Sequence, residues 1–130
     1  MTRTFSTDPS APAPDHERRR RHRRGQLAET VAGFYLRMKG YRILARRFKT
    51  AVGEIDLVAS RGRHLAFVEV KRRKAVPDAE ASITARQRTR IHRAAEVWLA
   101  RNPGLRDRDI SFDVVFLLPW HWPRHIVGGL

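Results

Sequence analysis

The sequence contains no cysteine, and this absence excludes disulfide bonds, thiolate zinc sites and a cysteine nucleophile. It also lacks any apolar run approaching the ~20 residues that a membrane-spanning helix needs. Residues 1–24 contain no apolar stretch of the kind found in secretory signals, and Asp15 and Glu17 argue against a transit peptide. No glycine-rich phosphate-binding loop is present either. We therefore expect a cytoplasmic protein that has no membrane partner.

Acidic residues are scarce: 13 stand against 27 Lys and Arg in 130 residues, which gives a formal net charge of +14. This excess favours a polyanionic partner, most simply nucleic acid. Residues 1–24, rich in Pro and Arg, predict a disordered basic tail, because such a segment cannot bury enough apolar surface to offset its ordering entropy. Residues 25–130 then form a single domain, for which an apolar content of 42% suffices.

Apolar spacing predicts two helices, over residues 25–39 and 84–101, and a capping box between Thr84 and Gln87 opens the second. Strand patterns lie between and after them, so the order α-β-β-β-α-β predicts an α/β fold with a mixed β-sheet flanked by helices. The strand patterns cover residues 41–48, 53–59, 65–71 and 110–118, with 124–127 as a candidate edge strand.

The two central strands form a predicted hairpin whose register decides which side chains meet. If Ser60 faces Leu65 across a four-residue loop, Asp56 lies opposite Glu69. Because side chains alternate between the faces of a strand, both acids share one face with Lys71, and a slip of one residue would separate them. Glu54 is expected on that charged face too, and the opposite face is expected to be apolar, formed by Ile55, Leu57, Ala59, Ala66, Val68 and Val70.

Two facing carboxylates repel each other unless a cation lies between them. Mg²⁺ suits such a pair, because it prefers a few carboxylate oxygens and completes its shell with water. A lysine on the same face would steady an attacking hydroxide or a phosphate oxygen. The pattern therefore indicates a site for phosphodiester hydrolysis. From the spacing alone, a solvated hairpin face with cross-strand ion pairs is an equally good interpretation.

Two segments of this hairpin, residues 53–59 (Gly-Glu-Ile-Asp-Leu-Val-Ala) and 67–73 (Phe-Val-Glu-Val-Lys-Arg-Arg), resemble the signature of the YraN family. These small bacterial proteins look like nucleases of the PD-(D/E)xK, restriction-endonuclease-like superfamily. The resemblance extends over residues 24–127 and includes Gly-Gln-Leu-Ala-Glu at 25–29 and Phe-Asp-Val-Val at 112–115. It implies a restriction-endonuclease-like three-layer core and a nuclease-like domain.

The resemblance also implies a role for individual residues. Asp56 and Glu69 would be ligands of Mg²⁺ or Mn²⁺, and Lys71 would be the catalytic lysine. Glu29 has the place of a helix glutamate that assists the metal in archaeal Holliday-junction resolvases of this superfamily; the alternative is an ordinary helix carboxylate paired with a nearby base. The implied activity is a metal-dependent endonuclease that hydrolyses DNA, branched or structured DNA included. Because dimers are common in the superfamily, the resemblance is also compatible with a homodimer.

Basic residues beside the predicted site, and along one side of the second helix, predict phosphate contacts of low sequence specificity. A solvated basic face is the alternative interpretation. Gln87 lies where many nucleases of the superfamily carry Lys or Gln. The predicted nucleic-acid contacts are Arg72, Arg73, Lys74, Arg86, Gln87, Arg90 and Arg93.

The six histidines show no metal-binding pattern. Among the tryptophans, Trp98 is predicted to lie in the core. Trp120 and Trp122 fall in a predicted loop, where packing over an apolar edge is favoured over stacking on an unpaired base.

Two other functions compete with a nuclease. The first is a non-catalytic nucleic-acid-binding protein that retains the nuclease fold. Two departures from the family pattern leave it open: Gln87 stands where YraN relatives usually have Lys, and Arg47 stands where Asn is typical. The second is a structural or partner protein whose charge only favours assembly. Facing acids favour the nuclease, because they would repel phosphate in a simple binding module. DNA and RNA are not distinguished by the sequence.

Overall fold

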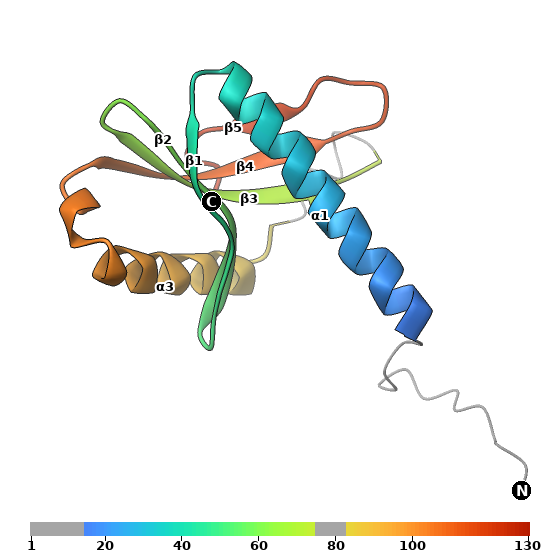
Figure 1. Cartoon of the computed structure of the whole chain (residues 1–130), viewed down its shortest axis with the longest axis horizontal. Helices are drawn as coiled ribbons and strands as arrows, with labels where there is room; N and C mark the ends of the chain where they lie inside the picture. Colours follow the sequence, from blue (N-terminus) through green and yellow to red (C-terminus); the bar gives the residue numbers. More distant parts are fainter. Residues whose placement is uncertain (1–14, 75–82) are drawn as a thin grey trace, which may run out of the picture.

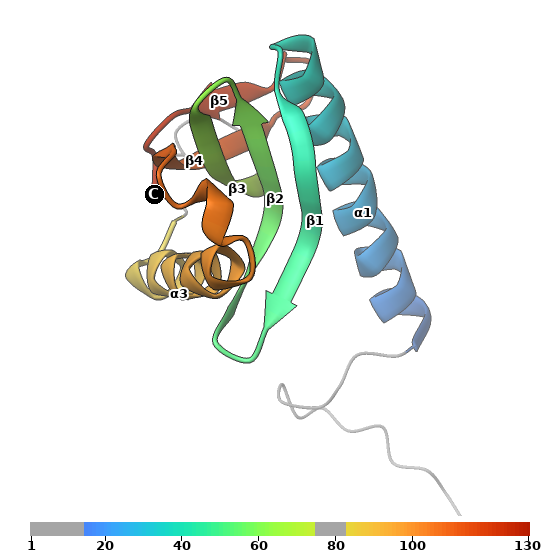
Figure 2. The ribbon, with the colours of Figure 1, turned by 60° about the vertical axis from the view of Figure 1, so that its left-hand side comes forward.

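The computed structural model describes residues 15–74 and 83–130. Its centre is a five-stranded mixed sheet in the order β1-β2-β3-β4-β5, with helix α1 on one face and α3 on the other (Figures 1 and 2). This arrangement confirms the predicted α/β fold. The elements are α1 (Asp15–Met38), β1 (Arg42–Thr50), β2 (Gly53–Arg61), β3 (His64–Arg72), α3 (Ala85–Arg101), a 3₁₀ turn (Pro103–Leu105), β4 (Asp109–Leu117) and β5 (Arg124–Ile126).

Helix α1 begins at Asp15 and not at residue 25, so the predicted start was wrong. The apolar pattern on which that prediction rested begins only after the arginine-rich run. The run itself contains good helix formers and no glycine or proline, so helix propensity favours a longer helix than the apolar pattern indicates. The division into a tail (1–24) and a domain (25–130) stays a prediction, and residues 1–14 lie outside the described part.

Strands β1, β2 and β3 form an antiparallel meander, whereas β4 lies parallel to β3. A parallel neighbour requires a crossover, and α3 is the helix between β3 and β4. The short strand β5 closes the sheet antiparallel to β4. No helix within residues 15–74 or 83–130 is long and apolar enough to cross a membrane.

The predicted register of the β2–β3 hairpin is confirmed, because Ser60 pairs with Leu65. The loop is tighter than predicted, since Arg61 also pairs with His64 and leaves a two-residue turn. Gly62 has a φ of +59° in that turn, a conformation that glycine adopts without strain. Towards the open end of the hairpin, the ladder ends at the pair of Leu57 with Val68.

The prediction of one apolar and one charged face was wrong for most of the hairpin, because helices cover both faces of the sheet. Leu57 and Val68 pack with α1 residues, while Val58 and Phe67 pack with α3 residues including Ile91 and Trp98. Burial of both faces is usual for sheets that lie between helix layers.

Ile55 departs from the simple alternation, since it packs in the α3 core although Leu57 packs under α1. Beside this point of β2, Arg47 of strand β1 has a φ of +52°. The sheet is therefore irregular at Asp56, between Ile55 and Leu57. Irregularities of this kind re-aim side chains at functional sites.

Helix α3 lies very close to the start of β2. A Cβ atom on Gly53 would stand 1.9 Å from the carbonyl oxygen of Arg90, so only glycine fits there. The helix begins with the predicted capping box: Gln87 N–H donates to Thr84 Oγ1 over 3.1 Å, and Thr84 N–H donates to Gln87 Oε1 over 3.0 Å. These contacts fix α3 against the hairpin that carries the two acids.

Candidate active site

Asp56 and Glu69 come together where the β2–β3 ladder ends. The backbone N–H of Val70 donates to Asp56 Oδ2 over 2.8 Å. Val70 lies beyond the last ladder pair of β2 and β3, so a side-chain oxygen, and not a backbone carbonyl of β2, accepts this hydrogen bond. The negative charge of Glu69 also acts on the Asp56 carboxyl group. The two acids that the register aligned thus form a coupled pair.

Asp56 is an unusual carboxyl group. Burial raises its pKa to about 7, and the negative charge of Glu69 adds to the rise, while the hydrogen bond from Val70 N–H opposes it. Near neutral pH a proton therefore competes for Asp56, and this proton removes the repulsion between the two acids. A divalent cation would remove the same repulsion.

Lys71 lies on the side of this pair. Its Nζ is 3.1 Å from Glu69 Oε1, and both side chains are only 14% exposed. Partial burial strengthens such an ion pair over a surface one, and it fixes the ammonium group in position. Asp56, Glu69 and Lys71 are therefore within one small cluster, as the spacing indicated.

Glu29 reaches the same place from helix α1. Burial raises the pKa of Glu29, the charge of Asp56 raises it further, and Arg47 lowers it. Arg47 Nε lies 3.5 Å from Glu29 Oε2, and the Glu29 side chain is 14% exposed. Glu29 is thus a partly buried acid paired with a residue of β1, and not a solvent-exposed carboxylate on the outside of its helix.

These acids line a cavity of about 300 Å³ between α1 and the ends of β2 and β3. Two of the predicted nucleic-acid contacts, Arg72 and Arg73, belong to the same wall, and Lys74 lines an adjoining groove. The cavity therefore combines acidic and basic side chains in one lining. Its lining consists of Gly25, Ala28, Glu29, Asp56, Glu69, Val70, Lys71, Arg72 and Arg73.

The basic residues of α3 do not join this cavity. Arg86, Arg90 and Arg93 are exposed on their helix, but no residue of α3 is among those that line the acidic cavity. The side-chain oxygen of Gln87 is engaged in the capping box. The structure therefore separates the predicted nucleic-acid contacts into a group beside the acids and a group on α3.

The donor set fits a hard divalent cation in part. Among residues 15–74 and 83–130, no group of three or more His, Cys, Asp and Glu is arranged to hold a metal ion. A cation would therefore rest on the two carboxylates of Asp56 and Glu69 and on water. Mg²⁺ accepts this kind of shell, because it keeps several waters and uses one or two carboxylates.

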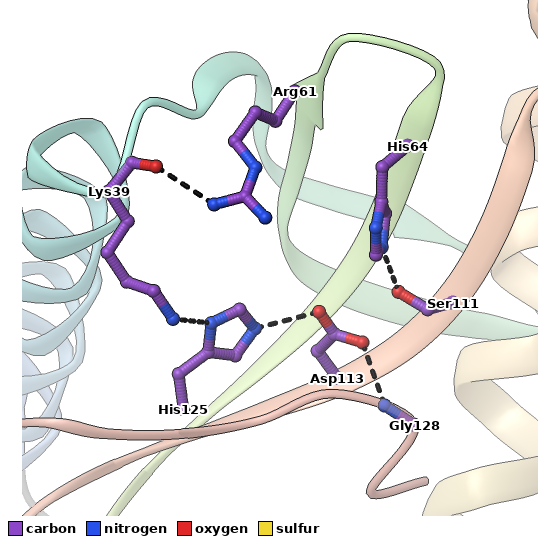
Figure 3. Close-up of polar contacts among 7 residues, drawn as sticks. All are labelled: Lys39, Arg61, His64, Ser111, Asp113, His125 and Gly128. Carbon is purple, nitrogen blue, oxygen red and sulfur yellow. Dashed lines mark hydrogen bonds and ion pairs between the residues drawn. The ribbon is translucent and has the colours of Figure 1, made fainter.

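A second polar cluster, which sequence reasoning missed, lies at the middle of β4, around Asp113 (Figure 3). Asp113 Oδ2 accepts a hydrogen bond from His125 Nε2 over 2.8 Å, and Asp113 Oδ1 accepts one from Gly128 N–H over 3.1 Å. Lys39 Nζ lies 2.6 Å from His125 Nδ1, which joins the end of α1 to the edge strand β5. The signal available in the sequence was one aspartate inside the apolar strand at 110–118.

The environment of Asp113 favours its charged form. Burial acts to raise the pKa of Asp113, but hydrogen bonds from His125, Ser111 and Gly128 N–H outweigh it, and the pKa is lowered. The side chains of Asp113 and His125 are 0% and 1% exposed. Neither side chain is accessible to a ligand. The hydrogen bonds of this cluster join β5 and the end of α1 to β4, so its role is to hold them on the sheet.

The tryptophans divide differently from the prediction. Trp98 is buried in the core between α3 and the sheet, as predicted. Trp120 and Trp122, predicted to pack over an apolar edge, are instead 101% and 77% exposed. That prediction was wrong because the loop after β4 carries both rings away from the protein body.

The fold and the cluster define a class: a mixed sheet between two helices, with paired acids and a lysine at the open end of its central hairpin. The model of the uncharacterised protein family UPF0102 matches residues 28–117, and this protein belongs to that family, which the resemblance above names YraN. The match includes Glu29, Asp56, Glu69 and Lys71.

Relatives confirm the family assignment over most of the chain. The UPF0102 protein of Methylorubrum extorquens (strain PA1) is 50% identical over 113 residues, which are 87% of this chain and 88% of that protein. The UPF0102 protein of Methylobacterium nodulans is 49% identical over 129 residues, 99% of this chain and 95% of that one. UPF0102 protein RPA0323 of Rhodopseudomonas palustris is 51% identical over 107 residues, 82% of each chain.

Proposed function

We propose that this protein is a metal-dependent endonuclease that hydrolyses phosphodiester bonds in DNA. The observation that carries the proposal is the partly buried Asp56–Glu69 pair, with Lys71 at 3.1 Å from Glu69. Bare carboxylates would repel a phosphodiester, so paired acids beside basic residues can bind this substrate only when a cation joins the two carboxylates. Perturbed carboxyl groups in a cavity are typical of functional sites.

Asp56 and Glu69 would hold Mg²⁺ or Mn²⁺, which when bound activates water and neutralises charge on the phosphate. Lys71 Nζ can donate a hydrogen bond to a phosphate oxygen, and the ion pair with Glu69 orients the lysine side chain. Arg72 and Arg73 hold the flanking phosphates, because they line the same cavity. Low sequence specificity follows, since all these contacts are to the backbone.

The proton on the Asp56–Glu69 pair must leave before a cation binds. With the pKa of Asp56 raised to about 7, protons compete with the cation below pH 7 and compete little above pH 8. Cation affinity, and with it cleavage, should therefore rise with pH through this range. A solvent-exposed pair of carboxylates with ordinary pKa values would show no such rise.

One observation favours a second candidate, a nucleic-acid-binding protein without catalysis. A proton on Asp56, whose pKa is raised to about 7, and the Lys71–Glu69 ion pair compensate the charges of the acids in the absence of a cation. Such a site would be stable as it stands, and the basic residues around it would bind phosphate.

An assay of cleavage separates the two. Wild type, Asp56→Asn and Glu54→Gln are incubated with linear duplex, single-stranded and four-way-junction DNA and with RNA, in Mg²⁺, Mn²⁺ or EDTA. Glu54 is the matched control, since it is an exposed acid of the same strand that does not line the acidic cavity, and its charge contributes least to the raised pKa of Asp56. We expect cleavage by wild type and Glu54→Gln with metal, and none by Asp56→Asn. Binding without cleavage in every condition would favour the second candidate.

A further inference from the structure

An apolar groove of about 740 Å³ adjoins the acidic cavity. One wall is the exposed side of α1, with Leu27 and Val31, which remain 63% and 43% exposed. The end of β4 and the two residues after it form the other wall. Among the described residues, the lining is Leu27, Ala28, Val31, Arg72, Arg73, Lys74, Leu117, Leu118 and Pro119.

The groove and the acidic cavity are continuous, because Ala28, Arg72 and Arg73 line both. A chain molecule with one phosphate at the acids can therefore extend directly into the groove. The basic residues lie at the junction, where the next phosphate of the chain would be. A ligand of this groove thus combines an anionic backbone with an apolar group.

The positive charge of the protein decides which of three ligands suits the groove: a second copy of this chain, a DNA duplex or an unpaired nucleotide. A second copy of this chain, at +14, would bring like charge against Arg72, Arg73 and Lys74. A DNA duplex offers the phosphates but keeps the faces of its bases stacked inside. An unpaired nucleotide offers both, and apolar side chains are the surfaces against which enzymes pack an extruded base.

An exposed aromatic residue follows the groove residues in the sequence. Trp120 comes directly after Pro119, which lines the groove, is 101% exposed, and has a φ of +63°. Such a backbone conformation is unfavourable for a bulky residue and is found where function requires it. An exposed tryptophan beside a basic groove is the arrangement that stacks on bases of single strands.

We propose that this groove binds an unpaired base of the strand whose backbone passes the acidic cavity. This inference rests on the proposed function and narrows its substrate class to DNA that is single-stranded, or locally unpaired, next to the bond that is cut.

The experiment measures binding in EDTA, where no cleavage occurs, of a labelled single strand of about 12 nucleotides and of a duplex of equal length. Leu27→Ser/Val31→Ser alters the groove. Phe34→Ser/Met38→Ser is the matched control on the same helix, because both side chains are exposed and neither lines the groove. No variant changes charge, so the salt dependence should stay equal.

We expect wild type and control to bind the single strand more tightly than the duplex, and the groove variant to lose about tenfold affinity for the single strand alone. Trp120→Ser is expected to act in the same direction. Equal affinity of the wild type for both probes would overturn the inference and leave cleavage untouched. A single-strand preference that the groove variant abolishes would support it, even if no cleavage assay detects hydrolysis.

Discussion

Two aspartates on the strands of this sheet lie in opposite electrostatic environments. Asp113 is buried and accepts hydrogen bonds from His125 and Gly128 N–H, and its pKa is lowered. Asp56 receives one backbone N–H, faces Glu69, and its pKa is raised to about 7. Both residues belong to strands of the sheet, Asp56 to β2 and Asp113 to β4. Their partners differ: Asp113 is surrounded by hydrogen-bond donors, whereas Asp56 faces a second acid.

The difference separates a structural acid from a candidate functional one. A carboxylate whose partners are all donors stabilises the fold in its charged form. A carboxylate that faces another acid destabilises the fold at neutral pH and is relieved by a cation. Sites that bind ligands often carry such unfavourable arrangements, since stability is not what they are selected for.

The largest expected effect on stability is at Asp113. Asp113→Ala leaves His125 and the Gly128 N–H without their acceptor in a dry environment, and we expect a loss of about 3–5 kcal/mol in the free energy of unfolding. Urea denaturation followed by circular dichroism measures it. A loss below about 1 kcal/mol would mean that the cluster does not hold β5 and α1 in place.

Lys71→Ala should lower cleavage at least 100-fold, about 2.7 kcal/mol in activation free energy. The affinity for DNA should change little, because other cations share the phosphate contacts. In binding assays the slope of log affinity against log salt should fall by at most about 0.9, the value of one contact. Unchanged cleavage would show that Lys71 has no part in the chemistry.

The pH dependence of stability should distinguish Asp56 from Asp113. Because the folded-state pKa of Asp56 is raised, its charge lowers stability as the pH rises from about 4 to 7, and the penalty is complete above 7. Asp56→Asn keeps an acceptor for Val70 N–H and loses the charge. We expect it to be about 2 kcal/mol more stable than wild type at pH 8, with the advantage vanishing at pH 4.

Asp113→Asn should show the reverse sign. The lowered pKa of Asp113 gives stability that is fully present above the ordinary aspartate value and is lost at lower pH. Denaturation midpoints at pH 3 and pH 8 measure both variants. An Asp56→Asn variant that is less stable than wild type at pH 8 would contradict the repulsion on which the site rests.

The smallest expected effect is stabilisation by the cation itself. At a Mg²⁺ concentration tenfold above the dissociation constant, binding should add about 1.4 kcal/mol to the stability of the wild type. Glu54→Gln should respond like wild type and Asp56→Asn should not respond. A thermal shift of equal size in all three proteins would exclude Asp56 as a ligand.

Periodic features of this molecule were predictable from the sequence, and contacts between distant segments were not. Alternation and loop chemistry predicted the hairpin register, and the register aligned Asp56 with Glu69. The position of Ile55 was not predictable, because the irregularity of the sheet at Asp56 breaks the alternation.

The cluster around Asp113 joins three elements, α1, β4 and β5, and each contributes one polar residue that looks unremarkable in its own segment. Arg47, which pairs with Glu29, was likewise hidden, since the contact joins α1 to β1 across the sheet. The exposed Trp120 escaped prediction for the opposite reason: apolar character normally indicates burial, and here the loop after β4 keeps the ring in solvent.

The most direct test is an NMR titration of the side-chain carboxyl carbons of Asp56 and Asp113 in the full-length protein, with and without Mg²⁺. We predict that Asp56 titrates near pH 7 without metal and at clearly lower pH with saturating Mg²⁺, while Asp113 titrates below the ordinary aspartate value in both conditions. An Asp56 that titrates near pH 4 without metal, or whose titration Mg²⁺ does not move, would contradict the proposed cation site.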